Sequence, residues 1–276
     1  MCRHLAWLGP PRTLERLLCE PEFGLLRQSY APRRQRFGTI NADGFGAAWY
    51  VPGRREPVRY RRAQPMWADA SFASLAPTIA AGCVLGAVRS ATIGTASDES
   101  CAAPFTDGPL AFSHNGRIDD WAGARRALAA EVADVRQAWA GVDSALAFGL
   151  VAAAYRRAAP AAAYGPEAPE APPGEAPGAV AAALVEAVSR LRPFGGRLTF
   201  LATDGATVAG TVVAEPMYLT RRDGGVLIAS EPDCTQQCDD EWRQIPDEHL
   251  VRVAAAPSGV DAPDIVVEPL PHPNHG

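Results

Sequence analysis

A cysteine directly follows the initiator methionine, and it is the first residue of the chain with the chemistry of a nucleophile. The small side chain of Cys2 favours removal of Met1, which would leave Cys2 as the first residue. An N-terminal cysteine combines a thiol of pKa about 8.5 with an α-amine of pKa about 7.7–8.0, so nucleophile and base share one residue. Cysteines at position two also occur by chance, so Cys2 alone does not define a site.

A second candidate is an arginine at the end of an apolar segment. Arg89 follows residues 84–88, which are predicted to form a strand, and Thr92 lies three residues further on. A guanidinium group can hold a carboxylate through two parallel hydrogen bonds. The alternative is that Arg89 forms an ordinary surface ion pair.

A third candidate is His114-Asn115-Gly116, which follows the apolar segment 110–113. The Asn115 side-chain amide and the Gly116 backbone N–H would be two donors for a tetrahedral oxyanion. Losing one such donor typically lowers the rate by about 10²–10³-fold. The alternative is a plain tight turn, for which Asn-Gly is a good pair.

These candidates need elements that bring them together. Residues 2–8, 84–88 and 110–113 are predicted strands, and 143–156 is a predicted helix beginning at Asp143. The pattern also predicts helices at 14–18, at 69–81 with Phe72, Leu75 and Ile79 inward, and at 179–191, and strands at 45–51, 58–62, 197–203, 207–213, 217–222 and 225–229. This order predicts an α+β fold with two antiparallel sheets covered by helices.

The order of the motifs resembles that of the class II glutamine amidotransferases over roughly residues 2–254. The resemblance rests on Cys2, Asn41-Ala42-Asp43-Gly44-Phe45-Gly46, Arg89-Ser90-Ala91-Thr92, His114-Asn115-Gly116, Asp143-Ser144 and Ala229-Ser230-Glu231-Pro232. It implies the four-layer αββα sandwich of N-terminal nucleophile hydrolases. This implied fold agrees with the two covered sheets predicted above.

The resemblance also implies a role for six residues. They are Cys2, Asn115 and Gly116 in catalysis, and Arg89, Thr92 and Asp143 in substrate binding. In this scheme Arg89, assisted by Thr92, holds the substrate α-carboxylate, and Asp143 receives its α-ammonium. A free γ-glutamyl head presents one group of each charge, so one fixed cation and one fixed anion suit it.

The start Met1–Gly9 and the late segment 241–250 resemble the branch of this family that acts in ergothioneine biosynthesis. That implies hydrolysis of γ-glutamyl-hercynylcysteine sulfoxide to glutamate and hercynylcysteine sulfoxide, through a γ-glutamyl thioester on Cys2. Ile93 departs from the pattern, because many members have histidine there, and it hints at specialisation. Trp49, Tyr50 or Trp67 could face the trimethylammonium of such a substrate, although core packing also explains each of them.

Composition bounds the class of protein. The 276 residues are 47% hydrophobic and 21% charged, which is typical of a globular chain. The net charge is −5 and the arginines are dispersed, which argues against nucleic-acid binding. The longest apolar stretch, 145–155, is too short to cross a membrane, and the N-terminus lacks the apolar core of a signal peptide, so we expect a cytoplasmic protein.

One domain, residues 2–255, accounts for most of the chain. Residues 158–178 are rich in Pro, Ala, Glu and Gly and are predicted to be a flexible insertion, and residues 256–276 an extended tail. Cys234 and Cys238 could form half of a metal site, but the other half is missing, so we predict no metal and no cofactor. Cys19, Cys83 and Cys101 are expected to be buried or incidental thiols, and the six cysteines no disulfide framework.

Two other functions remain open. The chain could be a glutaminase subunit that passes ammonia to a separate synthase, in which case glutamine is the preferred substrate. It could also be a non-catalytic binding protein that keeps the fold and retains Met1. In each catalytic case the partner is a small γ-glutamyl molecule, and the oligomeric state stays open.

Overall fold

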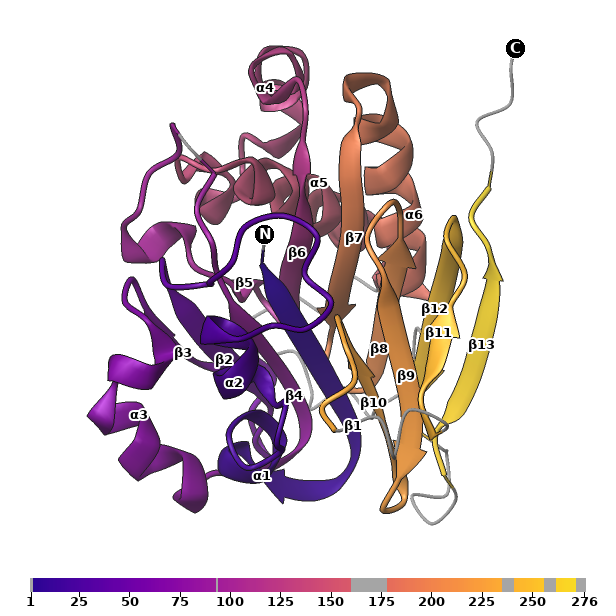
Figure 1. Ribbon diagram of the computed structural model, residues 1–276. Helices are drawn as coiled ribbons and strands as arrows, with labels where there is room; N and C mark the ends of the chain where they lie inside the picture. The colour runs from indigo at the N-terminus through magenta and orange to yellow at the C-terminus, as the bar shows by residue number, and fades with distance from the viewer. Residues whose placement is uncertain (1, 93, 160–177, 235–240, 256–261, 272–276) are drawn as a thin grey trace.

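Two antiparallel sheets face each other at the centre of the computed structural model (Figure 1). The structure describes all residues except 1, 93, 160–177, 235–240, 256–261 and 272–276. The first sheet has the order β11-β9-β10-β1-β4-β2-β3, and the second β13-β12-β8-β7-β6-β5. Their bounds are β1 (Arg3–Thr13), β2 (Phe45–Trp49), β3 (Val58–Arg62), β4 (Ala80–Val88), β5 (Phe105–Asp107), β6 (Leu110–Ile118), β7 (Gly196–Thr203), β8 (Thr207–Val212), β9 (Met217–Arg222), β10 (Gly225–Ala229), β11 (Arg243–Ile245), β12 (His249–Ala254) and β13 (Asp264–Pro269).

Helices cover the outer face of each sheet, which completes four layers. The first sheet is covered by α1 (Leu14–Leu18), α2 (Leu25–Tyr30) and α3 (Ala70–Leu75), and the second by α4 (Trp121–Leu128), α5 (Asp143–Ala158) and α6 (Ala179–Leu191). Three apolar clusters fill the spaces between the layers: one under each group of helices and one between the sheets. The predicted αββα sandwich is confirmed.

Strand β1 lies in the middle of the first sheet, between β10 and β4. Its alternate side chains serve two clusters, because neighbouring residues of a strand point to opposite faces. Leu5 and Trp7 pack under the helices, whereas Ala6 and Leu8 pack between the sheets. This double burial explains why residues 5–8 are all apolar.

The helix predicted over 69–81 is wrong in its second half. α3 ends at Leu75, a 3₁₀ turn follows at Ala76–Thr78, and β4 already begins at Ala80. Pro77 is the physical reason, because its ring and missing N–H do not fit a helix interior. Phe72 is buried as predicted, but Leu75 is 42% exposed.

Other departures lie at the edges of the sheets. β6 continues to Ile118, so the Asn115-Gly116 pair lies within a strand and the tight-turn alternative is wrong. The short strands β5 and β11 to β13 had not been predicted, and β13 lies within the segment predicted as an extended tail. Asp223 and Gly224 form the turn between β9 and β10, with φ values of 53° and 77°. Most of the predicted insertion, 160–177, lies outside the described residues.

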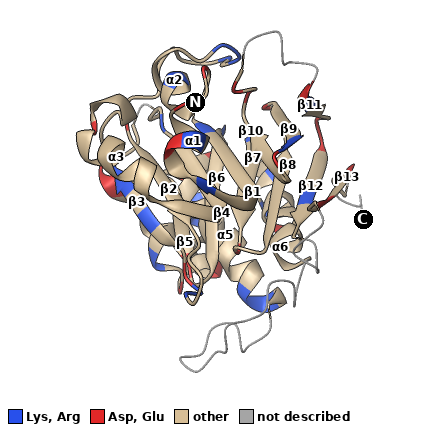
Figure 2. Ribbon diagram, turned by 90° about the horizontal axis from the view of Figure 1, so that it is seen from below, with Lys and Arg blue, Asp and Glu red and all other residues tan. Residues whose placement is uncertain are grey.

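Charged residues are scattered over many elements rather than gathered on one (Figure 2). Among the described helices, none is long and apolar enough to cross a membrane.

Candidate active site

The nucleophile candidate lies where three strands of the first sheet meet. Arg3 of β1 pairs with Val88 of β4, and Val88 pairs on its other side with Phe45 of β2. Cys2 precedes Arg3 and Arg89 follows Val88, so the two residues lie next to each other just beyond this pair. Cys2 is partly exposed, and its thiol is free.

Arg89 is buried without a carboxylate partner. It is 4% exposed, and its guanidinium donates to Ala96 O at 2.7 Å and Thr95 Oγ1 at 3.2 Å. Among the described residues, no acid lies within ion-pair distance of it. A buried cation held only by neutral oxygens strongly favours an incoming anion.

The segment after Arg89 is fastened by the turn before β2. Asp43 accepts a hydrogen bond from Ala91 N at 2.7 Å, and its own N–H donates to Arg89 O at 2.9 Å. The Thr92 carbonyl oxygen accepts from the hydroxyl of Thr95 at 2.7 Å. Asp43 thus sets the position of Arg89 and Thr92, which explains the acid in the Asn41–Gly46 motif. Ile93 lies outside the described residues.

Gly116 presents its N–H at the open edge of β6. The Leu198 N–H donates to the carbonyl oxygen of Val213, which directly follows β8. The Gly116–Leu198 pair is therefore not hydrogen-bonded across β6 and β7. The Gly116 N–H therefore points away from β7, as does that of Ile118, which donates to Asp143 Oδ2 at 2.9 Å. A Cβ at position 116 would overlap the backbone of Arg197, so the close approach requires glycine.

Asn115 points to the opposite face of β6 and is fully buried. Its Nδ2 donates to Ser230 Oγ over a long 3.4 Å, and Ser230 Oγ also accepts from His4 N at 3.0 Å. Ser230 N in turn donates to His4 O at 2.9 Å. Ser230 therefore ties the amide of Asn115 to the strand that carries Cys2.

Asp143 is the first residue of α5 and is 5% exposed. Its two oxygens accept from the backbone N–H groups of Ile118 and Ser144, each at 2.9 Å. Each carboxylate oxygen has two lone pairs, so one acceptor position per oxygen remains for a ligand. Asp143 thus offers a substrate ammonium a carboxylate that is rigidly held.

The two histidines near the site, His4 and His114, are uncharged and have a supporting role. His114 Nε2 lies 2.8 Å from Arg197 O, so it carries the proton, and Nδ1 accepts from Ser144 Oγ at 3.1 Å. Burial lowers the pKa of His114. Burial is also the main cause that lowers the pKa of His4 to about 3, and the nearby guanidinium of Arg3 lowers it further. Neither histidine is a cation at neutral pH.

A small cavity joins most of these groups. Five of the six predicted site residues line it, namely Cys2, Arg89, Thr92, Gly116 and Asp143. Its volume is about 20 Å³, close to that of one water molecule, so a γ-glutamyl group must widen it on entry. Asn115 is not in the lining, and its amide lies against Ser230, which also binds His4 two residues after Cys2.

A larger hollow of about 580 Å³ lies between β9, β11 and β13. Its described lining contains neither cysteine nor histidine. Size therefore does not make it the better candidate, and we place the active site at the smaller cavity.

Comparison with known proteins gives two close relatives of nearly full length. The chain is 40% identical over 270 residues to a protein of Mycolicibacterium smegmatis named γ-glutamyl-hercynylcysteine sulfoxide hydrolase, covering 98% of this chain and all of that one. A protein of the same name from Mycobacterium tuberculosis is 38% identical over 253 residues, covering 92% and 93%. The chain belongs to this hydrolase family.

This chain has the fold of the class II amidotransferases. A solved class II glutamine amidotransferase-domain protein of Silicibacter pomeroyi has a TM-score of 0.63 at 21% identity and covers 98% of this chain and all of its own. A scan against protein-family models finds no match.

Sequence reasoning identified the site residues of this chain better than the residues that support them. Ser230 and Ser144 were visible within the quoted motifs, but nothing in the sequence indicated that their hydroxyls would bridge to Asn115 and His114. Glu231 is also buried, and its carboxylate accepts from the backbone N–H groups of Arg33 and Arg34 at 3.1 and 2.7 Å. It fixes the loop before β2.

The cysteines and aromatic residues singled out in the sequence lie in different surroundings. Cys234 is disulfide-bonded, which the expectation for the cysteines did not include, and Cys238 lies outside the described residues. Among the described residues, no cluster of potential metal ligands occurs.

Trp49 packs in the core, and the Tyr50 hydroxyl lies 2.6 and 2.9 Å from two carbonyl oxygens. Trp67 is 45% exposed and meets Tyr30 edge to face.

Proposed function

We propose that this protein hydrolyses the γ-glutamyl amide of γ-glutamyl-hercynylcysteine sulfoxide to glutamate and hercynylcysteine sulfoxide. The observation that carries the proposal is the single cavity lined by a free cysteine, an unpaired buried cation and a fixed carboxylate. The name shared by the two mycobacterial relatives supports this choice of substrate. The protein would work in the cytoplasm.

In this scheme the site recognises the glutamyl head group by pairing each of its charges with a residue of opposite charge. Arg89 holds the α-carboxylate of the glutamyl head with help from Thr92, and Asp143 receives the α-ammonium. The site would close around the head group, because removal of water strengthens both contacts. The γ-carbonyl carbon then lies against the sulfur of Cys2.

The first half of the reaction forms a thioester. After Met1 is removed, the α-amine of Cys2 takes the thiol proton, and the sulfur attacks the γ-carbonyl carbon. The negative charge on the carbonyl oxygen is stabilised by the Asn115 amide and the Gly116 N–H. When the C–N bond breaks, the ammonium of Cys2 returns its proton to the departing amine.

The second half releases glutamate. A water molecule gives a proton to the α-amine and attacks the thioester carbonyl carbon, through a second oxyanion bound by the same donors. The C–S bond then breaks, and the sulfur recovers the proton from the ammonium. No cofactor is required for either half.

Glutamate release from the sulfoxide conjugate and from glutamine, measured side by side with a native N-terminus, tests the proposal. We expect a strong preference for the conjugate, and Cys2→Ala should be folded and inactive. A preference for glutamine would favour an ammonia-supplying subunit. Activity of Cys2→Ala equal to the wild type would reject the thioester mechanism, and absence of all turnover with Met1 retained would favour a binding protein.

A further inference from the structure

One side of the active-site cavity is an apolar wall, residues 101–105, to which the mechanism above gives no role. Cys101, Ala103 and Phe105 of this wall line the cavity, whereas its charged groups come from elsewhere in the chain. A γ-glutamyl head has two methylene groups between its charged end and its amide, and methylene groups favour an apolar surface. The apolar wall is therefore the side of the cavity that suits this part of the ligand.

The apolar wall lies on two glycines, one just before β2 and one within it. A Cβ at Gly44 would lie 3.2 Å from the Cβ of Ala102, and one at Gly46 would lie 2.5 Å from Ala103 O. Gly46 pairs with Arg61 of β3, whose Cγ would lie 3.0 Å from the same added Cβ. Because Gly46 has no side chain, the wall can approach β2 closely and the side chain of Arg61 can reach it.

Arg61 binds the start of the apolar wall. Its Nη1 donates to Ala102 O at 3.0 Å and to Ser100 O at 3.4 Å. Both acceptors are neutral carbonyl oxygens, and hydrogen bonds from a charged donor are stronger than those between neutral groups. The half-buried guanidinium therefore fixes the backbone of the wall rather than one of its side chains.

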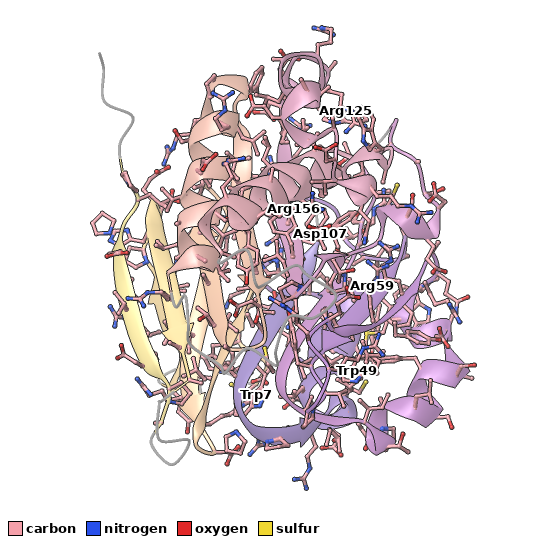
Figure 3. All side chains as sticks on the ribbon, turned by 180° about the vertical axis from the view of Figure 1, so that it is seen from behind. Trp7, Trp49, Arg59, Asp107, Arg125 and Arg156 are labelled. Carbon is pink, nitrogen blue, oxygen red and sulfur yellow. The ribbon has the colours of Figure 1, made fainter. Side chains whose placement is uncertain are left out.

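Arg59 binds the other end of the apolar wall. Its Nη1 lies 2.7 Å from Gln137 Oε1, 2.9 Å from Thr106 Oγ1 and 3.4 Å from Pro104 O. Gln137 in turn donates to Thr106 O at 2.6 Å. On this side β3 and β5 are the outermost strands of their sheets, so Arg59 reaches from the first sheet to the strand that carries Asp107 in the second (Figure 3).

We propose that Arg59 and Arg61 are positioning residues that hold the apolar wall at the place that fits a head group with two methylene groups. The inference rests on the proposed function in one respect, that the ligand is a γ-glutamyl group. Arg89 and Asp143 hold the charged end of that group, and Cys2 attacks its carbonyl carbon. The wall then decides which chain length brings the carbonyl carbon to the sulfur.

Two diazoketones test this without any leaving group of the substrate. One is the diazoketone analogue of glutamine, and the other is the asparagine analogue, which is one methylene shorter. Each alkylates a thiol with loss of N₂, and the mass of the N-terminal peptide gives the rate at Cys2. One methylene in a fitted apolar pocket changes a rate roughly 10- to 200-fold, so wild type should prefer the longer reagent at least about 10-fold.

Arg61→Ala should lose most of this preference. The released wall no longer measures chain length, so the ratio of the two rates should fall to within about threefold of unity. Arg59→Ala should act in the same direction. A ratio equal to that of wild type in both variants, even with a lowered melting temperature, would show a purely structural role and overturn the proposal.

Two controls separate the apolar wall from the reactivity of the thiol. Iodoacetamide has no head group, and its rate depends on ionisation and exposure of the thiol, so it should change less than about twofold in Arg61→Ala. The matched variant is Arg12→Ala, which removes an arginine paired with Asp223 at 2.6 Å near the far end of β1. Its ratio of diazoketone rates should equal that of wild type.

A second variant covers the case in which the alanine variants do not fold. Arg59→Lys combined with Arg61→Lys keeps both charges, but lysine is shorter and reaches fewer of the oxygens. Its ratio should lie between that of wild type and unity, and a wild-type ratio would overturn the proposal. Equal or absent reaction of wild type with the two diazoketones would also overturn it. If the ratios behave as expected but the sulfoxide conjugate is not cleaved, the assignment of substrate fails and the role of the arginines stands.

Discussion

Arg89 and Asp143 bring opposite charges into one cavity, and their different hydrogen bonding decides what each can bind. The guanidinium of Arg89 is held by neutral oxygens and forms no ion pair with any described acid. The carboxylate of Asp143 has two backbone donors, which hold it in a fixed position. A ligand with one carboxylate and one ammonium satisfies both residues at once.

Arg89→Ala should therefore weaken substrate binding and turnover together. We expect kcat/KM to fall at least about 100-fold, since the buried charge-assisted pair is lost for substrate and transition state alike. Arg89→Lys should recover only part of it, because an ammonium cannot make the two parallel bonds. Steady-state kinetics on the sulfoxide conjugate give the answer, and an unchanged KM in the alanine variant would contradict this role.

Asn115→Ala should act differently, on turnover alone. The amide would serve the oxyanion, so kcat should fall about 10²–10³-fold while KM stays within about threefold. Ser230→Ala is the comparison, because it removes the partner of Asn115 and keeps the amide itself. Equal losses in kcat and in substrate affinity for Asn115→Ala would indicate a binding role instead.

At the scale of elements, strand β1 carries both the nucleophile and a buried titratable group. His4 lies between the sheets, with a pKa lowered to about 3 against an ordinary 6.5. Between these two values the unfolded chain binds a proton that the folded chain does not. The free energy of unfolding therefore rises with pH through this window and becomes level above it.

His4→Asn should flatten this pH dependence. Between pH 7 and 5 the variant should lose roughly 2 kcal/mol less stability than wild type, or about 1.4 kcal/mol for each pH unit below 6.5. Urea unfolding at the two pH values measures the difference. The wild-type slope in the variant would mean that other groups, such as the buried His114, cause the acid sensitivity.

The elements also show what the sequence could predict. Strands with both faces buried, such as β1 and β10, have continuous apolar runs, and α5 has its acid in the first turn, so all three were found. β11 and β13 are short edge strands with exposed residues and no clear alternation, and only pairing with their neighbours makes them strands. Pro77 could have revealed the break after α3.

The site followed from residue types more readily than from geometry. Cys2, Arg89 and Asp143 could be assigned because their chemistry is specific and their motifs occur in order. The direction of the Gly116 N–H depends on which pairs of β6 and β7 are hydrogen-bonded, and the contacts of Arg59 join the edges of both sheets. Such long-range relations are not encoded in local patterns.

At the scale of the whole molecule, the start of β1 is enclosed by the fold, since Arg3 and His4 are fully buried. The loop before β2 passes around the start of β1 (Figure 1). A chain extended upstream of Cys2 would have no free α-amine at the site. We therefore expect activity to depend on exposure of that amine, beyond any effect on stability.

A retained N-terminal tag should abolish glutamate release, and proteolytic removal up to Cys2 should restore it. The same tag placed after residue 276 is the control and should leave activity intact. Intact mass reports whether the active form lacks Met1. A fully active protein with residues still attached before Cys2 would refute the role of the amine as base.

The pairing of β1 with β10 also orders events in time. His4 of β1 binds Ser230, which directly follows β10, and the two residues lie 226 positions apart in the chain. At a synthesis rate of roughly 5–20 residues per second, about 10–45 seconds pass between their emergence from the ribosome. Throughout that interval the first strand has no partner on one side, so Met1 stays accessible to an aminopeptidase. The surroundings of the residue translated second are thus complete only after residue 230 has been made.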